Sequence, residues 1–151
     1  MRCKLWKIIV VTLAFGLSGI NSLYAQTDTL LNGTWGMNVA GIETEITYDN
    51  GDYEQSTVLQ ELMGMTIRVR GTYTTSGDTL TMAPSHVYGG TIGLESRWLT
   101  QNELRTGLSR MGMPLPDLDQ AFGALFMQNN FTYTIRGNSL SLSQPQVFTR
   151  R

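Results

Sequence analysis

Few residues in this 151-residue sequence have side chains suited to catalysis, and the first of them is a single histidine. Ser85 directly precedes His86, and a serine beside a histidine is the pair that nucleophilic acyl transfer uses. Adjacent residues on a β-strand point to opposite faces, so we expect these two side chains to be kept apart. One histidine also falls short of the ligand set of a zinc site. The sequence therefore predicts neither a nucleophile with its base nor a metal centre.

The carboxylates stand where turns and helix starts need them. Asp49 and Asp52 flank a predicted hairpin turn, and Asp117 and Asp119 lie at the start of a helical pattern. Side chains of this type accept hydrogen bonds from backbone N–H groups at turns and at helix N-termini. The sequence also has no phosphate-binding glycine loop. We predict a protein that is not an enzyme and that carries no cofactor.

The first 25 residues have the composition of a secretory signal. Arg2, Lys4 and Lys7 precede an apolar core over residues 8–17, and Ala25 supplies a small residue before a cleavage point. The apolar run is about ten residues long, whereas a membrane-spanning helix needs roughly 20. We expect cleavage near Ala25, a secreted or periplasmic location, one domain over residues 26–151 and no stable membrane insertion.

Removal of that segment limits the partners and the chemistry of the remaining chain. The only cysteine, Cys3, and both lysines leave with it, which excludes disulfides, thiolate nucleophiles and Schiff bases. Eight basic residues, all arginine, then stand against 12 acidic ones, a formal charge of −4. Nucleic acids are bound by basic patches, so we predict no nucleic-acid partner.

The rest of the sequence alternates between apolar and polar residues in short segments, which predicts an antiparallel all-β domain. Residues 33–40 form the first expected strand, and Ile46 and Tyr48 lie on the apolar face of the second. Asn50 and Gly51 follow as a hairpin turn, because both tolerate the positive φ that such turns require. Further strands are expected over residues 53–60, 63–73, 86–95, 131–136, 139–143 and 147–150.

An internal repeat strengthens the prediction of hairpins. The segments "TYTTSGDTLTM" (72–82) and "TYTIRGNSLSL" (132–142) align without gaps. Gly77 and Gly137 supply the backbone angles of two turns, while Tyr73 and Tyr133 begin the apolar faces. The repeat predicts two equivalent hairpins within one barrel.

A helical insertion is expected late in the chain, over about residues 99–129. Thr100 and Glu103 have the spacing of a capping box, which predicts a helix that runs to about Arg110. Pro114 and Pro116 interrupt it. A second helix is expected after an N-cap at Asp117, with an apolar stripe. The stripe consists of Leu118, Ala121, Phe122, Leu125 and Phe126.

Gly33 and Trp35 on the first strand, the strand count and the terminal Val147–Arg150 segment together resemble a bacterial secreted domain of the lipocalin-like, or calycin, type. The resemblance implies an up-and-down antiparallel β-barrel of about eight strands. It also implies that Trp35 closes one end and that an arginine of the last strand packs across its ring. Arg150 stands at that position, with Arg151 and Arg136 as alternatives. The second lipocalin motif, Thr-Asp-Tyr, is absent.

Our favoured hypothesis is a barrel that binds a small hydrophobic molecule without transforming it. Apolar residues on the inward faces would line the site, with tyrosine hydroxyls to orient the ligand and the second helix closing the mouth. The expected lining residues are Ile46, Tyr48, Met65, Ile67, Val69, Tyr73, Tyr133 and Ile135, and the expected mouth residues are Phe122, Phe126 and Met127.

The same residues are compatible with a second reading. Inward methionines and the helical stripe can fill a barrel completely, since small barrels either pack solid or hold one small ligand. A solid barrel would favour a protein-interaction module that engages an envelope or secreted partner through its loops or its helical insertion.

Overall fold

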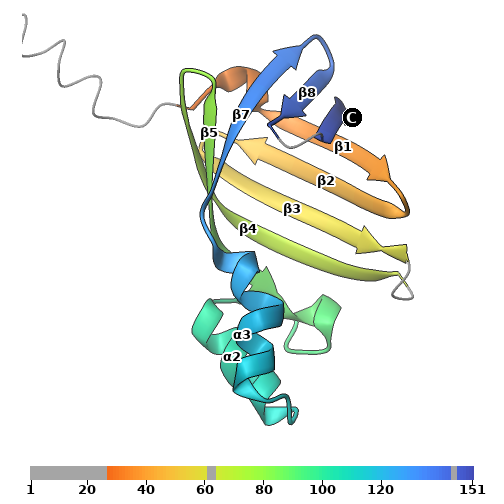
Figure 1. Ribbon diagram of the computed structural model, residues 1–151, viewed down its shortest axis with the longest axis vertical. Coiled ribbons are helices and arrows are strands. Elements are labelled where there is room, and N and C mark those ends of the chain that lie inside the picture. The colour runs from red at the N-terminus through yellow and green to blue at the C-terminus, as the bar shows by residue number, and fades with distance from the viewer. Residues whose placement is uncertain (1–26, 61–63, 144–145) are drawn as a thin grey trace, which may run out of the picture.

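The computed structural model describes residues 27–60, 64–143 and 146–151, and its strands close into an antiparallel barrel (Figure 1). The predicted signal segment lies outside the described residues. Each of the eight barrel strands pairs with the next barrel strand along the chain, and the last pairs with the first. This confirms the predicted up-and-down barrel of eight strands. The strands are β1 (Gly33–Val39), β2 (Ile42–Asp49), β3 (Asp52–Leu59), β4 (Met65–Ser76), β5 (Thr79–Tyr88), β7 (Asn129–Arg136), β8 (Ser139–Leu142) and β9 (Gln146–Arg150).

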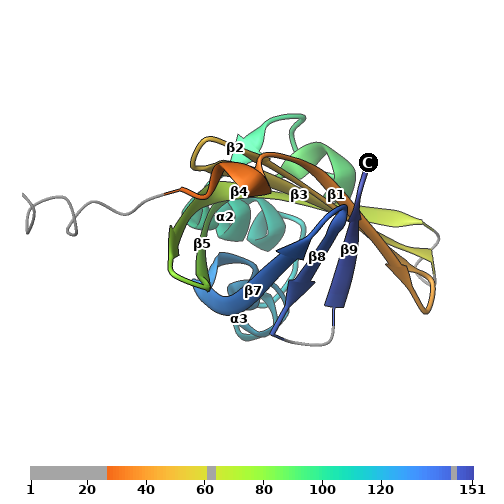
Figure 2. The same ribbon diagram turned by 90° about the horizontal axis from the view of Figure 1, so that it is seen from above.

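The barrel has two different ends, which we call closed and open. The closed end carries three tight hairpin turns and the short 3-10 helix η1 (Thr29–Leu31). The open end carries the Ala40-Gly41 turn between β1 and β2, and the helical insertion leaves the barrel there. From above, β7, β8 and β9 form the wall opposite β1, β2 and β3 (Figure 2).

The internal repeat forms two hairpins, as its sequence predicts. Tyr73 pairs with Met82 across β4 and β5, and Tyr133 pairs with Leu142 across β7 and β8. All four side chains are buried in the same interior. The repeat therefore marks two structurally equivalent pieces of one barrel wall.

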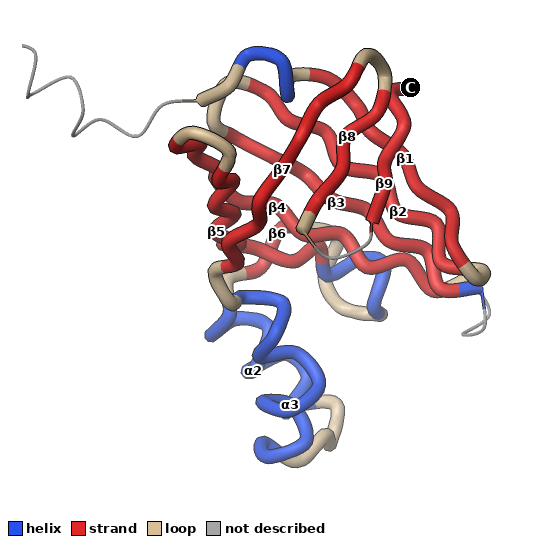
Figure 3. Tube along the Cα trace, turned by 45° about the horizontal axis from the view of Figure 1, so that its top comes forward, coloured by secondary structure: helices blue, strands red, loops and turns tan. Residues whose placement is uncertain are grey.

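The insertion between β5 and β7 lies beyond one end of β4 and β5 (Figure 3). Its first helix has the predicted capping box, in which Glu103 N–H donates to the Thr100 hydroxyl and Thr100 N–H donates to the Glu103 carboxylate. The elements are η3 (Gly89–Ile92), β6 (Trp98–Leu99), α2 (Gln101–Arg110), α3 (Leu115–Phe122) and η4 (Gly123–Phe126).

Two of the predicted boundaries in this region are wrong. The strand expected over residues 86–95 ends at Tyr88, where the chain turns into η3. Helix α3 begins at Leu115 after an N-cap at Pro114, three residues before the N-cap expected at Asp117. Pro116 lies within its first turn, where a missing N–H breaks no helical hydrogen bond, so this proline is compatible with the helix.

The buried apolar residues form two separate clusters. The barrel core fills the closed half of the barrel around Trp35, Tyr48, Tyr73 and Phe148. The insertion core joins Val69 and Val87 of the barrel wall to buried leucines of β6 and α2. The helical insertion is thus fixed to the open ends of β4 and β5 by its own apolar cluster.

Candidate functional site

The closed end is sealed by Trp35, whose side chain is 0% exposed. The indole Nε1–H donates to the Leu31 carbonyl oxygen at 2.7 Å, so the buried donor has a partner. The Arg150 guanidinium lies 4.7 Å from the ring centroid, the arrangement that the family resemblance implies. Its Nη2 also donates to the carbonyl oxygens of Leu30 and Asn32. Gly33 has a φ of +123° and lies beneath this arginine.

A layer of tyrosines lies on the Trp35 side of the interior. The rings of Tyr48 and Tyr73 meet edge to face at a centroid distance of 4.9 Å. The Tyr73 hydroxyl donates to Asn32 Oδ1, and the Tyr133 hydroxyl donates to Asp28 Oδ2 at 2.8 Å. Tyr73 and Tyr133 thus use their hydroxyls to hold residues 28–32 over the closed end of the barrel.

Burial controls the ionisation of this layer. Desolvation raises the pKa of Tyr53 to about 12 and raises the pKa of Tyr48 above its usual range. Burial, followed by the hydrogen bond to Asp28, raises the pKa of Tyr133 to about 12. The layer is therefore neutral at physiological pH and supplies no charge to the barrel interior.

A cavity of about 710 Å³ occupies the open half of the barrel. Apolar side chains dominate its walls, and Ile46, Met82 and Phe148 belong both to the cavity lining and to the buried barrel core. The Tyr48 hydroxyl lies 3.5 Å from Met82 Sδ, which connects the tyrosine layer to this lining. The cavity is lined by Met37, Val39, Ala40, Ile42, Thr44, Ile46, Gln55, Thr57, Met82, Asn129, Phe131, Leu142 and Phe148.

A small polar group interrupts this apolar wall. Gln55 Nε2 donates to the Thr57 hydroxyl at 3.2 Å, and the Thr44 and Thr57 hydroxyls lie 3.4 Å apart. All three side chains are on the inner face of β2 or β3 and line the cavity. A polar ligand group would find donors and acceptors on this wall and apolar contacts elsewhere.

The structure places most of the expected lining residues outside this cavity. Among them only Ile46 lines it; Tyr48, Tyr73, Tyr133 and Ile135 belong to the barrel core or pack against it. The hydroxyls of Tyr48, Tyr73 and Tyr133 form contacts within the fold, and the sequence pattern does not reveal these contacts. The remaining three, Met65, Ile67 and Val69, lie along β4, where Ile67 and Val69 join the insertion core and Met65 is 43% exposed.

The helical insertion does not form the expected lid over this cavity. Phe122 and Phe126 pack against the insertion core, and Met127 is 62% exposed. None of the three lines the cavity. The physical reason is that the apolar faces of Val69 and Val87 at the open ends of β4 and β5 hold the helices to that side of the barrel. The residues missed by the sequence analysis, such as Thr57 and Phe131, continue the inward alternation toward the open end.

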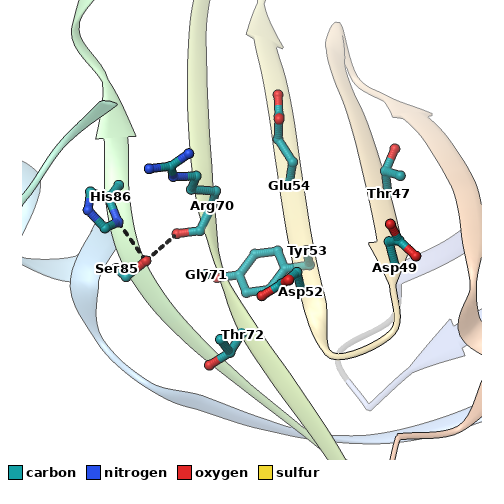
Figure 4. A pocket seen from close by; sticks show the side chains of 10 residues that line it. All are labelled: Thr47, Asp49, Asp52, Tyr53, Glu54, Arg70, Gly71, Thr72, Ser85 and His86. Atoms are coloured by element: carbon teal, nitrogen blue, oxygen red, sulfur yellow. Dashed lines mark hydrogen bonds between the residues drawn. The ribbon is translucent and has the colours of Figure 1, made fainter. Parts of the chain in front are cut away.

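A shallower hollow of about 390 Å³ lies on the outer face of β2 to β5 (Figure 4). A register shift between Arg70 and Gly71 leaves Ser85 without a strand partner. A Cβ on Gly71 would lie 2.1 Å from the Ala83 carbonyl oxygen, so only glycine fits at this irregularity.

The register shift also corrects the expectation that Ser85 and His86 are kept apart. Ser85 Oγ lies 2.8 Å from His86 Nδ1 and 3.3 Å from the Arg70 carbonyl oxygen. Either atom of the Ser85–His86 contact can be the donor, according to the imidazole tautomer. The Ser85 hydroxyl thus lies between the imidazole and the backbone of the irregular strand pair.

Beside this hollow, two arginines stack on aromatic rings. Arg70 lies 4.8 Å from the Trp98 ring centroid, and Arg68 lies 4.8 Å from that of Tyr88. Arg68 also forms an ion pair with Glu54. This contact group ties the short strand β6 to the outer face of the barrel.

Within the described ranges, no group of three or more potential metal-ligating side chains is close enough to hold an ion. None of the helices in that part of the chain is both long and apolar enough to cross a membrane. Comparisons with known proteins add no relative, since no family model, curated protein or solved structure matches the chain.

Proposed function

We propose that this protein binds a small hydrophobic molecule in the open half of its barrel and does not transform it. The observation that carries this proposal is the cavity of about 710 Å³ between β1–β3 and the opposite wall. Sites for small molecules are typically concave spaces of about 300–1,000 Å³ with apolar walls and few polar groups. The chain's cavity has that size and that lining.

The composition of the walls indicates the ligand class. Methionine, phenylalanine and isoleucine side chains would replace water around an apolar body, and methionine adapts to irregular shapes. Thr44, Gln55 and Thr57 would contact one polar group of the ligand. We therefore infer a neutral or weakly polar lipophile, which a calycin-type carrier would bind after export to the periplasm or the exterior. The signal-like composition of residues 1–25 supports that location.

Binding of N-phenyl-1-naphthylamine, a neutral hydrophobic fluorophore, tests the proposal. The exported protein should enhance its fluorescence with saturation at one site, and native mass spectrometry should detect a co-purifying lipophile. Thr57→Trp fills the cavity from a half-buried position and should weaken fluorophore binding by roughly tenfold or more, because the added indole occupies the volume that the ligand needs.

Ser56→Trp is the matched control. Ser56 is the neighbouring residue of β3 and points to the outer face, so the same substitution there should leave fluorophore binding unchanged. Unchanged binding in folded Thr57→Trp would show that the fluorophore binds elsewhere and would overturn the proposal. An equal loss in both variants, with both folded by circular dichroism, would show that filling the cavity is not the cause and would overturn it as well.

A second candidate function is a protein-interaction module. Met111 and Met113 are 61% and 37% exposed between α2 and α3, at the part of the insertion farthest along the chain from the barrel strands. Exposed apolar side chains on a protruding element are typical of partner sites. Pull-down with the wild-type protein and a Met111→Gln/Met113→Gln variant tests this candidate, since loss of a retained partner in the variant would support it.

A further inference from the structure

The open edge of the barrel carries a row of apolar side chains, which we call the apolar rim: Val39, Ile42, Leu59 and Met65. These four residues are direct cross-strand neighbours, because Val39 pairs with Ile42, Ile42 with Leu59 and Leu59 with Met65. They form the last rung of four adjacent strands. Val39, Ile42 and Met65 are 56%, 42% and 43% exposed.

The rim is continuous with the candidate ligand cavity. Val39 and Ile42 belong both to the rim and to the cavity lining, as does Ala40 in the turn between them. A molecule that entered the cavity from this side would pass over the rim. The exposed apolar surface therefore lies at the entrance of the site.

The four rim residues and the Ala40-Gly41 turn are uncharged. Glu61, in the connection between Leu59 and Met65, lies outside the described residues. Glu43 is the next residue along β2, and its carboxylate is paired with Arg151 at 2.8 Å. Contact of this edge with an apolar medium would therefore not bury an unpaired charge at Glu43.

The Ala40-Gly41 turn has no polar side chain. Ala40 has a φ of 52°, a left-handed conformation that asparagine and glycine adopt more readily than alanine. At the closed end, the equivalent turn has Asn50 with a φ of 47°. Alanine at this position gives the turn no polar side chain, at a conformational cost that asparagine would lower.

We propose that the apolar rim docks on the surface of a zwitterionic lipid bilayer, so that the ligand passes between bilayer and cavity without crossing water. The ligand transfer in this proposal rests on the proposed ligand-binding function, whereas the docking itself does not. The rim would enter the interface between headgroups and acyl chains, where exposed apolar side chains are stabilised by burial.

The size and charge of the rim favour this occupant over others. A stable protein–protein interface uses about 20–30 residues a side, far more than a four-residue rim and its turn. A bilayer needs no complementary surface. The formal charge of −4 after removal of residues 1–25 opposes attraction to anionic lipid. This favours a zwitterionic surface.

Flotation with phosphatidylcholine vesicles tests the docking. The protein is recovered after export, its N-terminus is determined by mass spectrometry, and its partition onto the vesicles is measured. The Leu59→Gln/Met65→Gln variant should partition roughly fivefold or more weakly, because burial of two apolar side chains is lost. Neither residue lines the cavity, so fluorophore binding in vesicle-free buffer should be retained.

Met111→Gln is the matched control, since Met111 is an exposed methionine on the helical insertion. It should float like the wild type. Failure of the wild type to float would overturn the proposal, as would an equal loss in Met111→Gln. A wild-type dimer that Leu59→Gln/Met65→Gln converts to a monomer would show that a second copy covers the rim, with the same consequence. Flotation without fluorophore binding would refute the proposed ligand function and leave the docking standing.

Discussion

The two ends of this barrel are built from the same strands but use their residues in opposite ways. At the closed end, Trp35 is buried, each nearby tyrosine has a contact, and polar turns face the solvent. At the open end, apolar side chains are exposed, the turn at residues 40–41 is apolar, and a cavity remains between the walls. The difference teaches that one end of a barrel can be packed and hydrogen-bonded while the other keeps an open cavity.

Trp35→Ala should produce the largest effect on this comparison. Removal of a fully buried indole loses its transfer free energy and leaves a cavity, so the free energy of unfolding should fall by about 3–5 kcal/mol. Urea denaturation followed by circular dichroism measures the change. The matched control is Trp98→Ala on the half-buried outer face of β6, which should cost clearly less. Equal losses would contradict the assignment of the closed end as the principal stabilising region.

Alkaline pH should loosen the closed end before other parts of the fold. The pKa values of Tyr53 and Tyr133 are raised from 10.0 to about 12 by burial, so the folded state retains protons that the unfolded state releases. Stability should be full below pH 10 and should fall as pH rises from about 10 through 12. Urea midpoints across this range, with tyrosinate absorbance, measure the effect. A midpoint that does not change up to pH 12 would contradict it.

The smallest predicted effect compares the two hairpin turns directly. Ala40→Asn should raise the free energy of unfolding by about 0.5–1 kcal/mol, because asparagine suits the left-handed conformation better. The same variant should bind phosphatidylcholine vesicles more weakly, since it places an amide in the apolar turn.

Asn50→Ala is the reciprocal variant at the closed end. It should destabilise the protein by about 1–2 kcal/mol, because it also removes the hydrogen bond that Asn32 Nδ2 donates to Asn50 Oδ1 at 2.9 Å. Its vesicle partition should equal that of the wild type. If Ala40→Asn were destabilising instead, the argument that this turn sacrifices stability for an apolar surface would be wrong.

Much of the barrel follows from local patterns. The alternation on β1 to β4, the turn at Asn50-Gly51 and the repeated hairpins each specify a strand pair through neighbouring residues. The capping box at Thr100 and Glu103 specifies the start of α2 in the same way. These features are predictable because their physical causes act within a few residues.

The half of the barrel that holds the cavity was harder to predict by the same reasoning. Alternation assigns Tyr48 and Thr57 alike to the inner face, but it does not reveal which of them meets a packed core and which meets a cavity. The expected lid failed for a related reason. The stripe containing Phe122 and Phe126 predicts an apolar contact, whereas the partner of that contact is set by the three-dimensional position of Val69 and Val87.

By itself, the sequence determined most of the strands and the late helices, because periodicity, turn chemistry and capping act locally. The up-and-down order and the plug at Trp35 were expected from the family resemblance. Only the tertiary structure decided where the interior is filled and where it is hollow, that the helices lie beside the cavity and not across it, and that four apolar residues from four strands align at one edge. Those outcomes depend on strand register and barrel closure, which bring together residues far apart in the chain.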